Sequence, residues 1–345
     1  MLLHWGEFLQ ALLHYTSCSS RCQADHFLLS RKNLSYNVSM MAELRSELSW
    51  SVSRAKMLRE CARRYYYHYY LSWGGWKPDA PPDCRKAYLL KSMVNLDMLA
   101  GQVVHDVIRE IFNREREMLG RVSCEQARKL ATTKLRDACR QSKEQLWRRS
   151  PKRFTNIFEH YYERDVPPSR RGKIKETVET CIVSFYASET FRLIQRAGAG
   201  RWLTIDQMDF FDFAGVKVYA APDFALRDGQ TVHIYDWKTG KPSVEVDEQL
   251  SCYALFAAER WKVRPNRIVP VAIYLRESKV EHVEVTEERL AHVKDHIRDS
   301  LSEMIELLRS VEHNLPRDSD AFPPTQLVGQ CSRCFFAELC EPHAG

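Results

Sequence analysis

Residues 221–240, APDFALRDGQTVHIYDWKTG, combine a β-hairpin pattern with charged side chains at defined positions. Two β-like runs flank Asp228-Gly229, a dipeptide that favours the positive-φ positions of a type I′ hairpin turn. The first run carries Asp223 and the second carries Asp236. A hairpin this short brings its two strands side by side, so we expect the two carboxylates to converge at one end.

Lys238 lies two residues beyond Asp236 in the second run. Because side chains alternate between the two faces of a strand, both are expected on one face. A protein core excludes such charges, since their burial is costly unless they pair or take part in chemistry. The hairpin alone therefore leaves two interpretations open, a functional site or an exposed Asp–Lys ion pair on a solvated strand.

The overall composition indicates a globular chain of 345 residues with 44% hydrophobic residues and a net charge of +6. This length predicts one elaborated domain or a domain with a helical annex. No apolar run of about 18 residues marks a membrane helix. The eleven cysteines are odd in number and mostly isolated, and no secretory signal stands out, so we expect a reduced cytoplasmic protein with one metal-binding subset.

The chain divides into an N-terminal extension and one domain in our interpretation. Residues 1–40 lack the basic n-region of a signal peptide and show no sustained period, and Met40-Met41 follow. We therefore predict that residues 1–40 are a non-essential or mis-assigned extension. Residues 41–345 are predicted to form the domain, with a helical insertion at about 120–200 and a C-terminal cysteine segment at 325–345.

The hydrophobic periodicity predicts an alternation of helices and strands. Helices are expected at residues 50–70, 97–118, 122–149, 172–196 and 246–260, and strands at 202–213, 216–220, 231–237 and 267–275. The helix at 246–260 connects two strands, which implies a mixed sheet with helices packed on it.

Two of the expected helices carry polar residues spaced four apart. Gly101 and His105 lie on the helix at 97–118, where glycine permits another segment to approach closely. A lone histidine near an apolar face is more often a core residue than a ligand. Gln249 and Tyr253 share one face of the helix at 246–260, directly after the charged hairpin.

A basic stretch between residues 148 and 175 interleaves cations with aromatic rings. Such a combination suits a phosphate backbone and stacked bases, whereas the alternative is an ordinary solvated face. The cations are Arg148, Arg149, Lys152, Arg153, Arg164, Arg170, Arg171, Lys173 and Lys175, and the rings are Phe154, Phe158, Tyr161 and Tyr162.

Three cysteines near the C-terminus have the spacing Cys-x2-Cys-x5-Cys. They are Cys331, Cys334 and Cys340. Three thiols leave a four-ligand site one short, and four thiolates can hold either an iron–sulfur cluster or a structural zinc. The spacing does not choose between these metals.

These motifs, in this order, resemble the PD-(D/E)XK nuclease superfamily. The likeness is to its RecB-like branch and to the iron–sulfur CRISPR-associated single-strand DNA exonucleases. The matching residues are Pro222-Asp223, Asp236-Trp237-Lys238, Gly101 with His105, and Gln249 with Tyr253. The resemblance covers about residues 50–343 and implies an α/β fold with a restriction-endonuclease-like core, a mixed central sheet flanked by helices. The basic helical stretch at 120–200 is longer than a minimal member of this family requires.

The resemblance also implies a metal-dependent DNA nuclease that hydrolyses phosphodiester bonds. The implied activity is that of an exonuclease on single-stranded DNA or DNA ends, in CRISPR adaptation (antiviral defence) or in DNA repair and recombination. The implied partners are CRISPR adaptation proteins or recombination and helicase proteins, with no membrane. Asp236 stands where many relatives have glutamate, and Asp206 is a candidate for an auxiliary acidic position.

The family likeness further assigns roles to the site residues. It implies that Mg²⁺ or Mn²⁺ is bound by Asp223, Asp236, the main-chain carbonyl of Trp237 and His105. Lys238 would orient or deprotonate the attacking water. Gln249 and Tyr253 would position the DNA strand.

The fourth cysteine ligand also comes from the resemblance. In the iron–sulfur relatives it lies far upstream, just before an aromatic and basic helix end. Cys61, followed by Arg63-Arg64-Tyr65-Tyr66-Tyr67, matches that context. We therefore expect Cys61 and the three C-terminal cysteines to hold a [4Fe-4S] cluster that joins the two ends of the domain, with zinc as the alternative.

Two further functional classes compete with the nuclease. One is a non-catalytic nucleic-acid-binding or adaptor subunit with a nuclease-like fold, and the intact Asp/Asp/Lys set argues against it. The other is an interaction protein stabilised by zinc.

Overall fold

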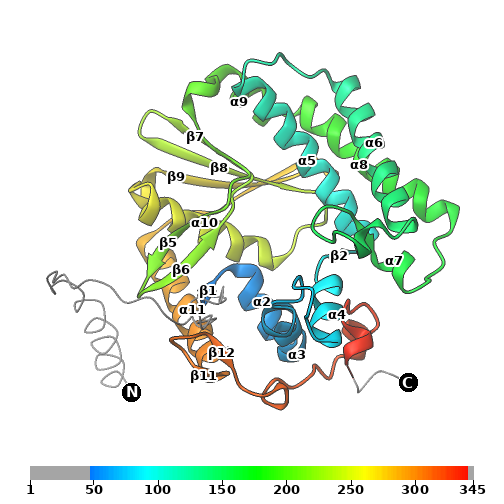
Figure 1. The fold of residues 1–345 in the computed structure, drawn as a ribbon. Coiled ribbons are helices and arrows are strands. Elements are labelled where there is room, and N and C mark those ends of the chain that lie inside the picture. Colours follow the sequence, from blue (N-terminus) through cyan, green and yellow to red (C-terminus); the bar gives the residue numbers. More distant parts are fainter. Residues whose placement is uncertain (1–46, 341–345) are drawn as a thin grey trace, which may run out of the picture.

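A mixed sheet of five strands lies at the centre of the computed structural model, which describes residues 47–340. The predicted extension at 1–40 lies outside the described residues. The strand order is β10-β9-β8-β7-β4, and only β8 and β9 run parallel (Figure 1). The strands are β4 (Trp202–Ile205), β7 (Phe224–Asp228), β8 (Thr231–Lys238), β9 (Ile268–Tyr274) and β10 (Lys279–His282). This arrangement confirms the predicted mixed sheet.

The hairpin β7–β8 forms as expected, but its turn lies one residue later than the sequence suggested. Asp228 pairs with Thr231, so Gly229 and Gln230 form the loop. Gly229 adopts φ 59°, whereas Asp228 stays in the strand. The prediction of Asp228-Gly229 as the two turn positions was wrong, because the ladder extends to Asp228.

The stretch 202–213 is two strands in different sheets. β4 ends at Ile205, and β5 (Asp209–Phe213) joins a three-stranded sheet of order β1-β6-β5 with β1 (Ser49–Trp50) and β6 (Val216–Ala220). Between the two strands, Asp206 adopts φ 46° and turns the chain. The prediction of a single strand here was wrong. Apolar residues recur at odd positions in both halves (Leu203 and Ile205, then Phe211 and Phe213), and nothing in the sequence indicates that Asp206 adopts a left-handed conformation between them.

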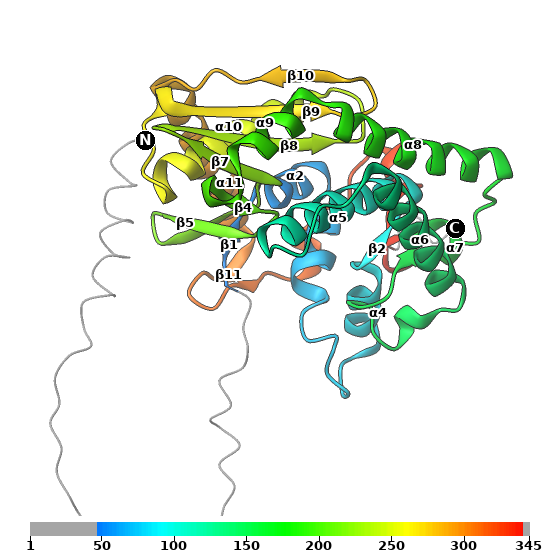
Figure 2. The ribbon, with the colours of Figure 1, turned by 90° about the horizontal axis from the view of Figure 1, so that it is seen from above.

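Helices cover both faces of the central sheet (Figures 1 and 2). One face packs on α5 (Leu96–Arg116) and α8 (Pro168–Ala187), with α6 (Cys124–Lys143) packed beside them. The other face packs on α10 (Val244–Arg260), α11 (Glu287–Glu306) and α2 (Val52–Glu60). Along β8, Val232 and Ile234 belong to the α10 side and Tyr235 and Trp237 to the α5 side. Even-numbered side chains of β8 therefore face α10, which decides where Asp236 and Lys238 point.

The predicted helices at 97–118 and 246–260 are confirmed as α5 and α10. The other three are interrupted. The helix at 50–70 breaks at the extended residue Cys61 into α2 and α3 (Ala62–Tyr66), followed by a π-helical turn at Tyr67–Leu71. Cys61 Sγ accepts a hydrogen bond from Arg64 N at 3.4 Å and so caps α3.

The two breaks in the helical region have local causes. The helix predicted at 122–149 ends early, at Lys143, the last residue of α6. Gln145 adopts φ 54°, and a 3-10 turn follows at Leu146–Arg148. The helix predicted at 172–196 divides at Ser188, whose side chain accepts from Phe191 N and caps α9 (Glu189–Ala197).

The two ends of the described chain meet beside α4 (Pro82–Leu90). Tyr67 Oη donates to the Leu339 carbonyl at 2.6 Å, and the Tyr67 ring packs 5.7 Å from Phe336. The remaining short elements are β2 (Met93–Val94), β3 (Asn156–Ile157), α7 (Phe158–Tyr161), β11 (Leu308–Ser310), β12 (Leu315–Pro316) and α12 (Val328–Cys331). Within residues 47–340, no helix is long and apolar enough to cross a membrane.

This junction generates a prediction on acid stability. Burial, and then the charges of Lys91 and Arg64, lower the pKa of His68 to about 4 from its ordinary 6.5. Because the pKa of His68 is lower in the folded state than in the unfolded state, the neutral imidazole stabilises the fold above pH 6.5. This contribution to the free energy of unfolding, about 3 kcal/mol, is lost as the pH falls from 6.5 to 4. Urea unfolding at pH 7 and pH 4.5 should show a smaller loss for His68→Gln than for the wild type. Exposed His292→Gln is the control, and equal losses in all three proteins would contradict the account.

Candidate active site and cysteine pocket

The carboxylate of Asp223 connects helix α5 to the β7–β8 hairpin. Its Oδ1 lies 2.9 Å from His105 Nδ1, and its Oδ2 accepts a hydrogen bond from Trp237 N at 2.7 Å. Both oxygens therefore have defined partners from different elements. The family likeness assigned Asp223 and His105 to one site, and the fold brings these two side chains into contact.

Asp236 is a buried acid with little compensation. Its side chain is only 3% exposed, and Oδ2 lies 2.5 Å from Lys238 Nζ in an ion pair whose angles make no hydrogen bond. Burial, and then the negative charge of Asp223, raise the pKa of Asp236 to about 6. A carboxylate in this position is costly for the fold, which favours the functional interpretation over a solvated ion pair.

His105 balances this negative charge. Burial lowers the pKa of His105, but the carboxylates of Asp223 and Asp236 outweigh it and raise the pKa to about 9. At neutral pH the imidazole is therefore protonated and donates to Asp223. The histidine is a part of the charged centre and not the ordinary core histidine that its apolar helix allowed.

Helix α10 holds Lys238 through a chain of hydrogen bonds. Lys238 Nζ donates to Gln249 Oε1 at 2.6 Å, and Gln249 Nε2 donates to Tyr253 Oη at 2.8 Å. Tyr253 Oη then donates to the carbonyl of Ala221, two residues before Asp223, at 3.0 Å. The spacing of four brings Gln249 and Tyr253 to one face of α10, as the sequence predicted, and that face meets the charged hairpin.

Trp237 contributes its main chain to the site and its ring to the core. The indole is 1% exposed and packs edge-on against Phe185 at 5.3 Å. Gly101 lies where Thr239, next to Lys238, approaches α5, because a Cβ on Gly101 would stand 3.3 Å from Thr239 Oγ1. The expected close approach is present, through a side chain.

Asp206 supports the site from the end of β4. Its N–H donates to the Asp223 carbonyl at 2.8 Å, and its Oδ2 lies 2.5 Å from Arg109 Nη1. Arg109 also pairs with Asp106 on the same helix. Arg109 and Asp106 were missed by the sequence analysis, although the position of Arg109, one turn beyond His105, was a usable signal.

The profile of the PD-(D/E)XK nuclease superfamily matches residues 49–341. The chain belongs to this superfamily. No curated protein matches the chain. Membership indicates a metal-dependent nuclease that acts on nucleic acid, and nucleases of this superfamily typically use Mg²⁺ or Mn²⁺.

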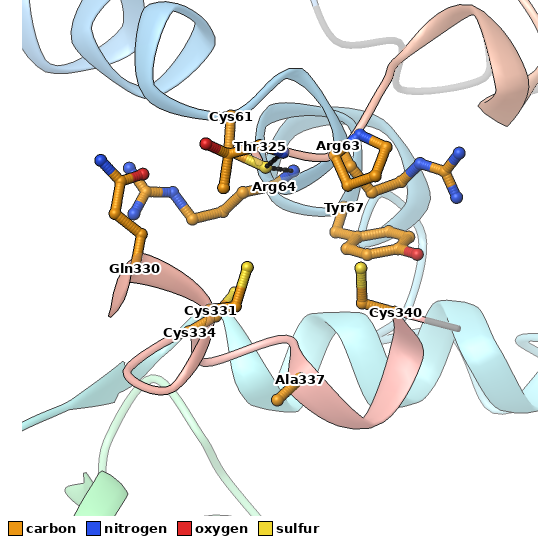
Figure 3. Close-up of a pocket in the computed structure, with 11 residues that line it drawn as sticks. Cys61, Arg63, Arg64, Tyr67, Thr325, Gln330, Cys331, Cys334, Ala337 and Cys340 are labelled. Carbon is orange, nitrogen blue, oxygen red and sulfur yellow. Dashed lines mark hydrogen bonds between the residues drawn. The ribbon is translucent and has the colours of Figure 1, made fainter. Parts of the chain in front are cut away.

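The nuclease fold also brings the four singled-out cysteines around one small cavity. Its volume is about 30 Å³, and its lining includes Cys61, Cys331, Cys334 and Cys340. Figure 3 shows the thiols of Cys331 and Cys340 extending from the C-terminal segment toward the segment that carries Cys61. Cys61 Sγ accepts hydrogen bonds from Arg64 N and Thr325 N, each at 3.4 Å.

The four thiols are not yet close enough to one another to coordinate one metal centre. Within residues 47–340, no three His, Cys, Asp or Glu side chains are placed close enough to form a metal-holding group. Burial raises the pKa of the Cys334 thiol to about 11, so a bound metal would be needed to hold it as a thiolate at neutral pH. Arg63 and Arg64 line the same cavity and favour negative charge on sulfur.

The hydrogen-bond chain on α10 generates a prediction for Tyr253→Phe. Losing the hydroxyl leaves Gln249 and the Ala221 carbonyl without a buried partner, which costs about 1–3 kcal/mol and loosens Lys238. We expect nucleolytic rates to fall about 10- to 100-fold. The control is Tyr186→Phe, which removes a hydroxyl–carbonyl hydrogen bond to Val122 in the helical region. Initial rates and urea unfolding should separate the two, and equal rates would refute the role of Tyr253.

Proposed function

We propose that this superfamily member is a DNA nuclease whose centre is formed by Asp223, Asp236, His105 and Lys238. The observation that carries the proposal is the buried Asp236, whose Oδ2 contacts only the Lys238 ammonium among the described residues, and whose pKa is raised by burial and then by a second carboxylate. Carboxylate and carbonyl oxygens are the ligands that Mg²⁺ prefers, and an imidazole favours Mn²⁺. The donor set therefore fits a hard divalent cation.

The residues have distinct roles in the proposed hydrolysis. Asp223, Asp236, the main-chain carbonyl of Trp237 and His105 would hold the cation, and His105 would have to release the proton that it carries at neutral pH. When bound, it supplies a Lewis acid at the scissile phosphate and lowers the pKa of a coordinated water. Lys238 orients or deprotonates that water and offsets negative charge in the transition state.

The two α10 residues act through Lys238. The hydrogen bond from Lys238 Nζ to Gln249 fixes the ammonium, and Tyr253 fixes Gln249 in turn. Their predicted role in positioning the DNA strand is compatible with this contact. The support for their placement in the machinery is therefore the hydrogen-bond chain.

The finer identity of the enzyme rests on the likeness to the RecB-like branch. We propose an exonuclease on single-stranded DNA or DNA ends, working in the cytoplasm with recombination, helicase or CRISPR adaptation proteins. The choice between CRISPR adaptation and DNA repair stays a prediction. The competing adaptor function is disfavoured because a buried ion pair such as Asp236–Lys238 contributes little net stability, so the fold gains little from keeping it.

Removal of the central charged groups tests the proposal. Asp236→Ala and Lys238→Ala should each reduce Mn²⁺-dependent cleavage of labelled DNA by more than about 100-fold, because each group acts on the reacting atoms. The matched controls are Asp228→Ala and Lys279→Ala, whose side chains form ion pairs elsewhere on the same sheet. Near wild-type cleavage by folded Asp236→Ala or Lys238→Ala would sink the assignment.

We also propose that Cys61, Cys331, Cys334 and Cys340 hold a [4Fe-4S] cluster, with zinc as the alternative. Support comes from the shared cavity, the two backbone N–H groups on Cys61 Sγ and the neighbouring arginines. A cluster here would connect the α2–α3 junction to the C-terminal segment across most of the chain. This long closure restricts the unfolded chain, which favours a structural role.

Metal analysis distinguishes the two metals. Protein purified without oxygen should be brown and contain iron and acid-labile sulfide, and Cys331→Ser should lose both because it removes one ligand. Cys84→Ser is the control, since that buried thiol lies outside the cavity and donates to the Trp73 carbonyl. A colourless wild type that contains zinc would contradict the iron–sulfur assignment.

A further inference from the structure

A cavity much larger than the cysteine cavity lies in the helical region, between α6, the 3-10 turn at Leu146–Arg148 and α7. Its volume is about 580 Å³, and we call it the basic groove. Its lining includes Lys143, Trp147, Arg148, His160, Tyr161 and Arg164. No residue of the candidate active site lines it.

The groove is lined by three exposed cations and three carboxylates. Lys143, Arg148 and Arg164 are exposed, and within residues 47–340 none of them forms an ion pair with a carboxylate. Two of the three carboxylates in the lining are already engaged. Glu159 accepts from Leu96 N with both oxygens, each at 3.2 Å, and Glu338 pairs with Lys86 at 2.7 Å. Glu163 is the third carboxylate of the lining. Burial raises the pKa of Glu338, but Lys86, Tyr161 and then Arg148 outweigh it and lower the pKa. A polyanion would therefore meet exposed cations that form no direct ion pair with the described carboxylates.

Arg148 is held on an aromatic surface. Its guanidinium carbon lies 4.8 Å from the centroid of the buried Trp147 ring, and its Nε donates to Gln145 Oε1 at 2.6 Å. Tyr161 packs 5.4 Å from the same indole. These contacts use one edge and one face of the guanidinium, and its terminal amino groups donate to no other described residue. A planar, pre-oriented fork of this kind suits a phosphate group.

The groove is joined to the active site through α5. Glu159 caps Leu96, the first residue of α5, and His105 lies further along the same helix, roughly 14 Å away at a rise of about 1.5 Å per residue. Figures 1 and 2 both show α7 beside this end of the helical layer.

We propose that the basic groove binds the phosphate backbone of single-stranded DNA that extends from the active site. This inference rests on the proposed DNA nuclease function and names a substrate contact outside its active site. A positively charged groove that follows the backbone is one element of single-strand binding sites. The groove thereby gives a function to part of the basic, aromatic stretch of the sequence, namely Arg148, Tyr161 and Arg164.

The test compares Arg148→Gln/Arg164→Gln with Arg264→Gln/Arg267→Gln. The control pair removes the same charge at the start of β9, the end of the sheet opposite Lys238. Binding of fluorescein-labelled thymidine 30-mers is measured over a range of salt concentrations, with Lys238→Ala in each protein to prevent cleavage. The groove variant should bind about tenfold more weakly, with a log–log salt slope smaller by about 1.4, since each phosphate contact contributes about 0.7. The control should stay within about twofold.

The outcomes separate this inference from the proposed function. An unchanged slope in the groove variant overturns the inference, and so does an equal loss on a 30-base-pair duplex, which would remove the single-strand assignment. With Lys238 intact, the groove variant should cleave a thymidine trimer as fast as its parent, because a trimer at the active site does not reach the groove. If the parent cleaves no DNA with Mn²⁺, the nuclease proposal fails, while the salt slope still decides the groove.

Discussion

The two hydrogen bonds of the Asp223 carboxylate hold the candidate active site together. One oxygen meets His105 on α5, and the other accepts the N–H of Trp237 on β8. A helix from the early part of the chain is thereby fixed against the hairpin, and Asp236 and Lys238 follow because they neighbour Trp237 in the same strand. Without this carboxylate, the protonated His105 would lose its ion-pair partner and Trp237 N its acceptor, and the burial of both groups would become an uncompensated cost.

The burial of charged groups in the site lowers the stability of the fold, and the surrounding apolar packing offsets that loss. Apolar clusters cover both faces of the central sheet, one facing α5 and one facing α10. Asp236 lies between these clusters, where burial and then the charge of Asp223 raise its pKa to about 6. Its carboxyl group is therefore protonated below about pH 6 and charged above it. The chain from Lys238 through Gln249 to Tyr253 satisfies polar groups that would otherwise be buried unpaired. Such an arrangement is typical of a reaction centre.

The sequence could predict the elements whose periodicity is local and the residues they present. The hairpin, α5, α10 and the face shared by Gln249 and Tyr253 follow from spacing alone. It could not predict the division of 202–213, because both strands keep one alternation across the left-handed Asp206. The break at Cys61 is stabilised by contacts from the far end of the chain, such as Thr325 N on its sulfur, and these leave no local pattern.

The central claim is that the charged end of the hairpin hydrolyses DNA with the help of a divalent cation. The most direct measurement incubates the purified wild-type protein with end-labelled single-stranded and double-stranded DNA, with Mn²⁺ and with EDTA. We expect single-stranded DNA to be shortened in Mn²⁺ and to stay intact in EDTA. Intact DNA of both kinds in Mn²⁺, from a folded and metal-replete protein, would contradict the claim.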